Sequence, residues 1–511
     1  MRRPIDGRTY PGHHRLRDKV DLTRLGALSL VLGLITAVVV SSSVAGAVTD
    51  TVTNCSGTAT DAGSLPFAVQ NANAGDTINF SVSCPPASPI VLAGTLDIDV
   101  NLTLQGSGPD VVAVSGNNSF PVISVPSGVT TSVSGVTIEN GLGHTGGGIV
   151  TAGTLTVTDS TVSGNNSSDG GGGIWNDNGS LTLTDSTVAA NNTYRGGGGG
   201  VENDHGGLTI ADSTLSANNA FNGGITIGGG GIENVDGTVA ITDSTFSQNA
   251  SDYNGGGGAV FNDNGTTDVT ASTLAHNATH RQGGGGGGNI ENEFGTVSVA
   301  GTVISNGKPT EDCSGTVTDA GYNLDDDGSC GFAAAGHSQS DVKPYMGPMQ
   351  DNGGPTETRA PALGSPVLNQ IPTGATGNGV TLCPGTDQRG VSRPQGSACD
   401  IGAVELSPTT QTITSPDGTT ATLHAPLSFT VTTTGTPTPN LTENGKLPKR
   451  LRFVDNGDGT ATISGPPRAT GRFHLTIAAT FGTGASAFVV TQAFTLTVVP
   501  AFWMQAPTPA T

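Results

Sequence analysis

The chain has 511 residues, with 41 Asp and Glu against 20 Lys and Arg, and a formal net charge of −21. A surface of that sign repels nucleic acid and anionic lipid, so we exclude nucleic-acid binding and expect solubility or cation binding. The 79 glycines and 4% aromatic residues would suit disorder if the pattern were irregular. Here the apolar residues keep step with a repeat, which predicts an ordered protein.

Residues 1–47 have the pattern of a signal peptide. A basic lead-in precedes the apolar run 25–40, and small residues at 45–47 offer a cleavage site. The run is 16 residues long, shorter than the ~20 of a membrane-spanning helix, so cleavage is favoured and a retained N-terminal anchor is the alternative. We expect a secreted or cell-surface (extracellular) protein, with no membrane insertion after cleavage.

Residues 48–145 are predicted to form an N-terminal cap and the first coils of the fold that follows. Residues 146–310 then repeat a glycine cluster, a short apolar strand, an alternating strand and a third strand. Five aligned serines are spaced by 26, 27, 31 and 28 residues, at Ser160, Ser186, Ser213, Ser244 and Ser272. Three short strands per ~27 residues are typical of one coil of a parallel β-helix, so the fold class is all-β.

Two columns of asparagine recur at the ends of the second and third strands. They are Asn176, Asn203, Asn234, Asn262 and Asn292, and Asn165, Asn191, Asn218, Asn249 and Asn277. We expect these residues to form tight corners with left-handed backbone and amides bonded from coil to coil. The glycine clusters should supply positive φ and room for the chain to turn.

The repeat ends before residue 311. Residues 311–405 are predicted to cap the open end of the helix, because that end would expose strand edges and core. Residues 406–500 show spaced strands with turn signals, as in a small Ig-like β-sandwich, and residues 501–511 form a tail. The six cysteines fall into three sequence-local pairs that favour disulfides, although other pairings remain open: Cys55 with Cys84, Cys313 with Cys330, and Cys383 with Cys399.

The repeat unit resembles the right-handed parallel β-helix repeat proteins of bacterial surfaces. "GGAV" at 257–260 and "FSQN" at 246–249 are similar to the two motifs of the polymorphic outer-membrane-protein adhesins. Residues 311–405 resemble the choice-of-anchor cap of exported β-helices. Residues 406–500 resemble the putative Ig domains of cell-surface proteins, through "LP" at 447–448 and "GDGTATISGPP" at 457–467. The resemblance implies architecture and a surface location, and says little about activity.

The repeats lack a recognisable arrangement of catalytic residues. A polysaccharide lyase needs an Arg or Lys base beside a cation, and a hydrolase needs paired carboxylates. Between residues 101 and 312 the basic residues are Arg195, Arg281 and Lys308, all in turns. No catalytic residues are therefore assigned. A partial threonine array suggests ice binding, but its columns decay to other residues.

One column beside the Asn corner is a candidate ligand site. It holds Trp175, Glu202, Glu233, Phe261 and Glu291, which we place outward-facing. Coils ~4.8 Å apart would bring Glu202 and Glu233 together, where a Ca²⁺ could bridge them. The alternative is a solvated acidic stripe. No other cofactor is predicted. "DDD" at 325–327 and "DNGDG" at 455–459 are oxygen-rich, and turns explain both.

The variable stretches before each glycine cluster are the predicted recognition surface. Their aromatic residues Tyr194, Phe221 and Tyr253 would line one edge if the coils stay in register, and exposed aromatics on a rigid support suit ligand contact. We predict a non-catalytic adhesion or interaction scaffold for a glycan or cell-surface protein. The alternatives are a polysaccharide-degrading β-helix lyase or hydrolase, and a purely structural envelope component.

Overall fold

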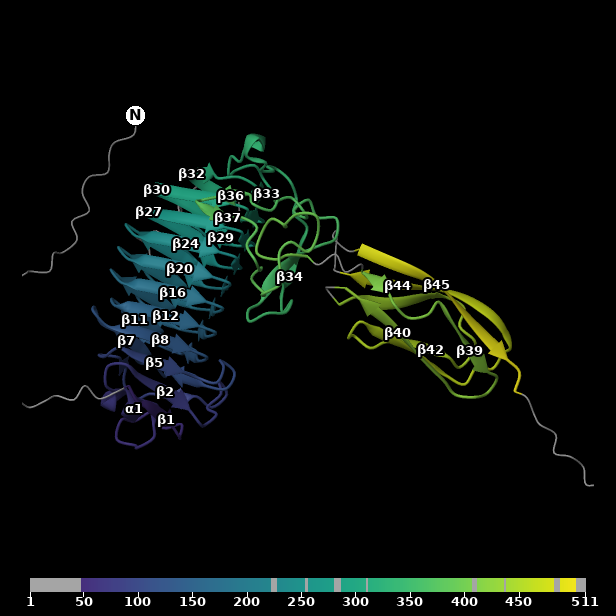
Figure 1. Cartoon of the computed structure of the whole chain (residues 1–511), viewed down its shortest axis with the longest axis horizontal. Helices are drawn as coiled ribbons and strands as arrows, with labels where there is room; N and C mark the ends of the chain where they lie inside the picture. Colours follow the sequence, from purple (N-terminus) through teal and green to yellow (C-terminus); the bar gives the residue numbers. More distant parts are fainter. Residues whose placement is uncertain are drawn as a thin grey trace, which may run out of the picture. The chain divides into compact units, whose positions relative to one another are not determined.

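The structure is a computed structural model that describes residues 47–501 apart from 222–227, 253–255, 280–285, 309–310, 407–410, 436–437 and 482–487. The signal-peptide interpretation and the tail therefore lie almost wholly outside the described residues. The described part is nearly all β, with a parallel β-solenoid of about 9 turns. Its coils stack from the purple β1 to the teal β32 in Figure 1.

Three parallel sheets form the faces of this β-helix, which confirms the predicted fold class. The broad sheet contains β1 (Thr49–Val52), β2 (Asp76–Phe80), β4 (Leu96–Asp97), β5 (Leu102–Gln105), β7 (Ile123–Val125), β8 (Thr130–Ser134), β11 (Ile149–Thr151), β12 (Thr154–Thr158), β15 (Ile174–Asp177), β16 (Ser180–Thr184), β19 (Val201–Asp204), β20 (Gly207–Ala211), β23 (Ile232–Val235), β24 (Thr238–Thr242), β27 (Val260–Thr270), β30 (Ile290–Ala300) and β32 (Cys313–Asp319).

The two other faces are built from shorter strands. The side sheet contains β3 (Ile90–Val91), β6 (Ala113–Ser115), β9 (Thr137–Glu139), β13 (Thr161–Ser163), β17 (Thr187–Ala189), β21 (Thr214–Ser216), β25 (Thr245–Ser247), β28 (Thr273–Ala275), β31 (Val303–Ser305) and β33 (Leu324–Asp325). The narrow sheet contains β10 (Leu142–Gly143), β14 (Asn166–Ser167), β18 (Asn192–Thr193), β22 (Asn219–Ala220), β26 (Ala250–Ser251) and β29 (Ala278–Thr279).

The predicted strands of each repeat are present, but the division into faces differs from the prediction. The strands that start at Ile174 and Ser180 belong to one sheet and fuse into single strands at β27 and β30. The third face is the narrow sheet, which the sequence did not predict. Its strands have two residues each, and two residues are too few to show the alternation that marks a half-buried strand.

The core is a continuous column of aliphatic side chains inside the coils. In one coil Ile174, Leu181, Leu183 and Val188 are all at most 1% exposed, and their Cα partners in the next coil are aliphatic too. Burying one such side chain contributes about 1.5–3 kcal/mol. Because every coil repeats this contribution, the alternation seen in the sequence suffices to stack the helix.

Both asparagine columns form ladders, as predicted. In the first, Nδ2 of Asn176, Asn203, Asn234 and Asn262 each donates to Oδ1 of the Asn in the next coil, at 2.7–2.9 Å. In the second, the Nδ2-to-Oδ1 bonds that link Asn165 to Asn277 through the coils measure 2.9–3.0 Å. The ladder continues with Nδ2 of Asn277 donating to Asn289 at 2.8 Å and Nδ2 of Asn289 donating to Oδ1 of Asp312 at 2.6 Å. Because these amides are buried, they need hydrogen-bond partners, and the stacked coils supply them.

The expected left-handed backbone at these Asn corners is wrong. Positive φ lies instead at the residue before the second column, at Gly164, Ala190, Ala217, Gln248 and His276. The residue before each Asn adopts the left-handed conformation that changes the chain direction. The Asn itself has negative φ, and its buried amide bonds to the next coil.

The glycine clusters match the expectation only in part. Gly171, Gly172 and Gly173 have no left-handed φ, and a Cβ there would meet backbone carbonyl oxygens of their own or the next coil. Positive φ occurs at glycines that begin or precede a cluster, at Gly146, Gly170, Gly197 and Gly286. Close backbone approach, rather than conformational freedom, is therefore the main reason for the three consecutive glycines.

The start of the helix contains an element that the sequence did not predict. Helix α1 (Leu65–Asn71) follows Ser64, whose hydroxyl accepts the N–H of Phe67 at 3.1 Å as an N-cap. Leu65, Ala68 and Val69 are buried against the first coils. Helix α1 therefore shields the hydrophobic core of the first coils from solvent.

The segment after the repeats does more than close the end of the helix. It contains η1 (Ala334–Gly336), β34 (Met346–Gln350), β35 (Thr358–Pro361), β36 (Thr376–Gly377) and β37 (Val380–Thr381). Part of it runs back along the side sheet, where Gln388 bonds to Ser213, Thr214 and Thr245. The outward threonines there are buried from Thr214 onward but only half-buried at Thr187, so the segment covers the later coils.

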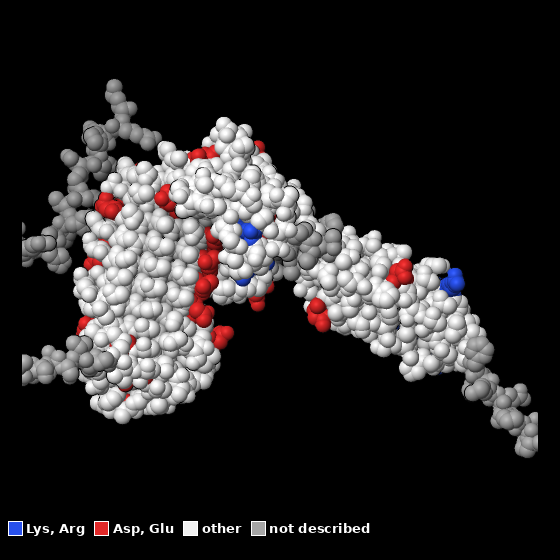
Figure 2. All heavy atoms as spheres, in the orientation of Figure 1, with Lys and Arg blue, Asp and Glu red and all other residues white. Residues whose placement is uncertain are grey.

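Acidic side chains border this covered face. Figure 2 shows acidic atoms in a line along the coils, next to the segment after the repeats. The turns before four successive side-sheet strands, β13, β17, β21 and β25, carry Asp159, Asp185, Asp212 and Asp243. Nη2 of the buried Arg393 lies 3.4 Å from Oδ1 of Asp243.

The C-terminal part consists of two four-stranded sheets around one core. The strands are β38 (Thr412–Ile413), β39 (Gly418–Thr422), β40 (Leu427–Thr434), β41 (Asn440–Gly445), β42 (Arg452–Asp455), β43 (Thr460–Gly465), β44 (Gly471–Phe481) and β45 (Phe488–Val499). All their pairings are antiparallel except β39 with β45. The Ig-like assignment and the domain limits stay predictions.

The three predicted disulfides form in the sequence-local pairing, between Cys55 and Cys84, Cys313 and Cys330, and Cys383 and Cys399. Disulfides persist in oxidising environments, which fits an extracellular location. Within the described residues, no helix is long and apolar enough to span a membrane.

Candidate functional site

The variable stretches leave the narrow sheet at successive levels of the helix. Tyr194 follows β18 and Phe221 follows β22, and these strands pair in parallel with Thr193 opposite Ala220. The chain stays in register one residue further, because the N–H of Tyr194 donates to Ser167 O at 3.1 Å and that of Phe221 donates to Thr193 O at 2.7 Å. The coil register thus places the two aromatic residues side by side.

The rings of Tyr194 and Phe221 stack. Their centroids are 5.8 Å apart and their planes differ by 15°. Tyr194 is 48% exposed, and its hydroxyl donates to Oδ1 of Asn166 at 3.2 Å. This confirms that two of the three predicted aromatics share one edge. Tyr253 lies outside the described residues.

An amide ladder that the sequence analysis missed runs beside the aromatic pair. Nδ2 of Asn219 donates to Oδ1 of Asn192, and Nδ2 of Asn192 donates to Oδ1 of Asn166, both at 3.1 Å. These side chains are half-buried, so part of each amide faces solvent. The recurring "NN" pairs at 165–166, 191–192 and 218–219 were the available signal, the first Asn facing inward and the second outward. We call Tyr194, Phe221, Asn166, Asn192 and Asn219 the aromatic–amide edge.

The acidic column is present, but its predicted exposure is wrong. Trp175, Glu202, Glu233, Phe261 and Glu291 are Cα partners along successive strands of the broad sheet. Glu233 and Glu291 are 7% and 8% exposed, Phe261 is 1% exposed, and Glu202 is half-buried. The glycine-rich chain before each strand packs against this column: a Cβ on Gly197 would collide with Oε2 of Glu202, and one on Gly228 would lie 3.2 Å from Oε2 of Glu233.

The buried carboxyls have strongly perturbed acidity. Burial, together with the nearby Asp204, raises the pKa of Glu202 to about 8, against the opposing effect of the N–H of Gly198. Burial likewise raises the pKa of Glu233 well above its ordinary value, with Glu202 as the next contribution. Burial also raises the pKa of Glu291, although the N–H of Gly287 donates to its Oε2 at 3.0 Å.

In the oxygen-rich sequence at 325–327, Asp325 is the last residue of β33, and the chain bends only from Asp326 onward, so the expected turn starts one residue later. Asp325 accepts the N–H groups of Gly328, Cys330 and Asp341. Asp326 pairs with Lys343 at 2.8 Å. These carboxylates are occupied by donors of the chain itself.

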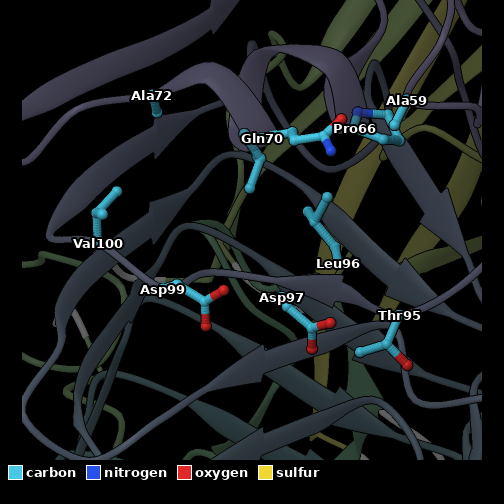
Figure 3. A pocket seen from close by; sticks show the side chains of 10 residues that line it. Ala59, Pro66, Gln70, Ala72, Thr95, Leu96, Asp97, Asp99 and Val100 are labelled. Atoms are coloured by element: carbon cyan, nitrogen blue, oxygen red, sulfur yellow. The ribbon is translucent and has the colours of Figure 1, made fainter.

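A shallow hollow of about 350 Å³ lies between α1 and β4. In Figure 3 the carboxylates of Asp97 and Asp99 face the same space as the amide of Gln70, with Leu96 between the two sides. A second hollow of about 460 Å³ lies beside the stacked rings of Tyr322 and His337. The first hollow is lined by carboxyl groups without a basic side chain, and the second by a histidine without a carboxyl group.

The candidate site residues therefore divide into a largely buried acidic column and an exposed aromatic–amide edge. Throughout the described part of the chain, no three His, Cys, Asp or Glu side chains converge as a metal-binding group. The acidic residues with raised pKa in the column pack against glycine-rich backbone. The aromatic–amide edge faces solvent.

Comparisons with known proteins bear on the fold alone. No protein-family model and no curated protein matches the chain. Among solved structures, the PL6 family alginate lyase AlyGC aligns with 73% of this chain and 61% of its own, at 12% identity and a TM-score of 0.29. A putative alpha-galactosidase from Bacteroides fragilis aligns over 17% of each chain, at 24% identity and a TM-score of 0.15. The chain thus spans less than two thirds of either protein, and similarity this low carries no argument about activity.

Proposed function

We propose that this protein is an exported, non-catalytic interaction scaffold, whose aromatic–amide edge binds a glycan on a cell surface or in the surrounding matrix. The observation that carries the proposal is the exposed stack of Tyr194 on Phe221 beside a ladder of half-buried amides. The rigid β-helix holds these side chains in place, so little conformational freedom is lost on binding.

The chemistry of the edge suits a sugar. The C–H face of a pyranose packs on an aromatic ring as other apolar surfaces do, and the amide groups of Asn192 and Asn219 can donate to and accept from hydroxyls. The stacking partner keeps the Tyr194 ring from rotating away, and its hydroxyl is held by Asn166. Three disulfides support an extracellular setting for such contacts.

The test is a glycan-array screen of the purified exported protein, with and without EDTA, followed by product analysis on each glycan bound. We expect binding without cleavage. Tyr194→Ala should reduce affinity at least about fivefold, since loss of an aromatic stacking contact costs about 1–3 kcal/mol. The matched control is Phe294→Ala, because Phe294 is 59% exposed in β30 and belongs to no aromatic pair in the described chain.

Three outcomes would contradict the proposal. Cleavage of a bound polymer would make the protein an enzyme. Equal losses for the Tyr194 and Phe294 variants would place the binding elsewhere. No binding to any glycan would leave a protein partner or a passive envelope role as the remaining functions.

A further inference from the structure

Two carboxyl groups in the acidic column lack a partner on one oxygen. Glu202 and Glu233 are opposite each other on β19 and β23. Oε2 of each is buried and makes no hydrogen bond, and Glu233 as a whole is 7% exposed. An unpartnered buried carboxylate oxygen is costly, so two of them on adjacent coils require a physical explanation.

The charges around the pair do not provide one. Among the described residues, the charged groups that act on the acidity of Glu202 include Asp204 and Asp169, and those that act on Glu233 include Glu202, Asp263 and Asp204. All of them are acidic. The compensation from the chain is the N–H of Gly198 on Glu202 and the N–H of Gly197 on Glu233. The pair therefore lies in a desolvated region of strongly negative potential, which favours a cation.

The spacing of the coils matches a divalent ion. Paired strands lie ~4.8 Å apart, so equivalent side chains of adjacent coils repeat at that distance. A Ca²⁺ ion binds carboxylate oxygens at about 2.3–2.6 Å, so one ion midway between two such oxygens would contact both. Mg²⁺ requires about 2.0–2.1 Å and near-ideal octahedral geometry, which suits this spacing less well.

We infer that Glu202 and Glu233 form a Ca²⁺ site, in which each coil contributes one carboxylate oxygen and the remaining ligands are backbone oxygens of the glycine-rich chain and water. The column limits the site to one pair of glutamates, because aromatic residues occupy the positions on either side of that pair. Phe261 separates Glu233 from Glu291, and Trp175 precedes Glu202. Oε2 of Glu291 already accepts the N–H of Gly287.

The site adjoins the loop that begins with Tyr194. Gly197 in that loop packs on Oε2 of Glu202 and donates its N–H to Glu233. A bound ion would hold this loop against the broad sheet. The inference does not depend on glycan binding, because ion binding has its own measurements.

Trp175 provides the readout. It is the Cα partner of Glu202 in the preceding coil, and the sequence has one other tryptophan, Trp503. Tb³⁺, a Ca²⁺ analogue, should show luminescence sensitised by Trp175 when added to the purified chain in calcium-free buffer, and excess Ca²⁺ should quench it by competition. Trp175→Phe should abolish the luminescence while calorimetry still detects binding.

Two matched variants localise the ion. Glu233→Gln keeps the size of the side chain and removes its charge, so it should lose at least 90% of the Tb³⁺ signal at the concentration that half-saturates the wild type. Glu291→Gln changes the same column at a carboxyl already bonded to backbone, so it should leave the signal unchanged. Tyr194→Ala should also bind Tb³⁺ normally, which separates this site from the proposed glycan site.

Thermal unfolding of the wild-type protein gives a test that needs no variant. Saturating Ca²⁺ should raise its Tm by about 3 °C over the value in EDTA, as for a ligand that binds the native state alone. The inference is overturned if the wild type shows neither sensitised luminescence nor a Tm shift. It is equally overturned if Glu233→Gln binds Tb³⁺ like the wild type, or if that variant is as stable in EDTA as the wild type is in Ca²⁺, since a shared proton would then explain the pair.

Discussion

Replacing Asn218 by Ala tests whether the inner amide ladder holds the coils together. Asn218 is fully buried, and its Oδ1 accepts the backbone N–H and Nδ2 of Asn191 at 3.1 and 3.0 Å. Its Nδ2 donates to Val188 O and Oδ1 of Asn249, both at 2.9 Å. The substitution removes all four bonds and leaves the N–H of Asn191 without this acceptor.

The expected cost follows from what remains bonded. Nδ2 of Asn191 keeps Val162 O at 2.9 Å, and Oδ1 of Asn249 keeps the N–H of Asn218 at 3.1 Å. The main terms are therefore one unsatisfied buried donor, about 1–3 kcal/mol, and about 1 kcal/mol for the remaining lost bonds. We expect the free energy of unfolding to fall by about 3 kcal/mol.

The assay is urea unfolding followed by the fluorescence of Trp175, which lies in β15 and reports on the helix. Asn219→Ala is the matched control, because this neighbour is half-buried and bonds outward to Asn192 at 3.1 Å. It should cost less than about 1 kcal/mol. If Asn218→Ala costs no more than Asn219→Ala, the inner ladder does not stabilise the coils as argued.

Three further predictions test the backbone and the buried acids. Gly173→Ala would place a Cβ 2.6 Å from a carbonyl oxygen of the next coil, so it should lower the free energy of unfolding in urea by about 1–3 kcal/mol. The control is Gly207→Ala, whose Cβ would have its nearest atom 3.7 Å away and which should be neutral or slightly stabilising. Equal effects of the two substitutions would contradict the packing argument. Ala217 has φ 53°, so Ala217→Gly should raise the free energy of unfolding by about 1 kcal/mol, and a lower Tm would refute this. Burial raises the pKa of Glu202 to about 8 and that of Asp243 to about 7, above the ordinary values of unfolded Glu and Asp. Their protonation therefore stabilises the fold fully below about pH 4, and this contribution is lost as the pH rises toward 7–8. In EDTA, Tm should fall from pH 5 to pH 8, and it should fall less in the double variant Glu202→Gln, Asp243→Asn; an unchanged slope would show that other groups dominate.

The sequence by itself determined the repeated part of the fold. Alternating residues such as Leu181 and Leu183 predict strands, and their recurrence with a constant order of Gly, Asn and Ser predicts stacked coils. The Asn ladders follow as well, since identical residues at identical corners must meet when coils stack. The disulfide pairs were predictable from their proximity in the chain, as one choice among several.

Features that depend on a few residues were less accessible. Each strand of the narrow sheet has two residues, too short for a period, and α1 is a single short helix within strand-like sequence. The segment after the repeats has no repeat of its own, so its contact with the side sheet through Gln388 could not be predicted from pattern.

The tertiary structure alone decided how the candidate sites are exposed. Sequence register places Tyr194 beside Phe221 and Glu202 beside Glu233, but it does not say which pair faces solvent. The glycine-rich chain before each strand decides this, because at Gly197 and Gly228 its backbone lies directly against the glutamate side chains and covers them. The same loops begin at the narrow sheet, where Tyr194 stays exposed. Burial is a property of what packs above a residue, and that depends on contacts between coils that no single stretch of sequence contains.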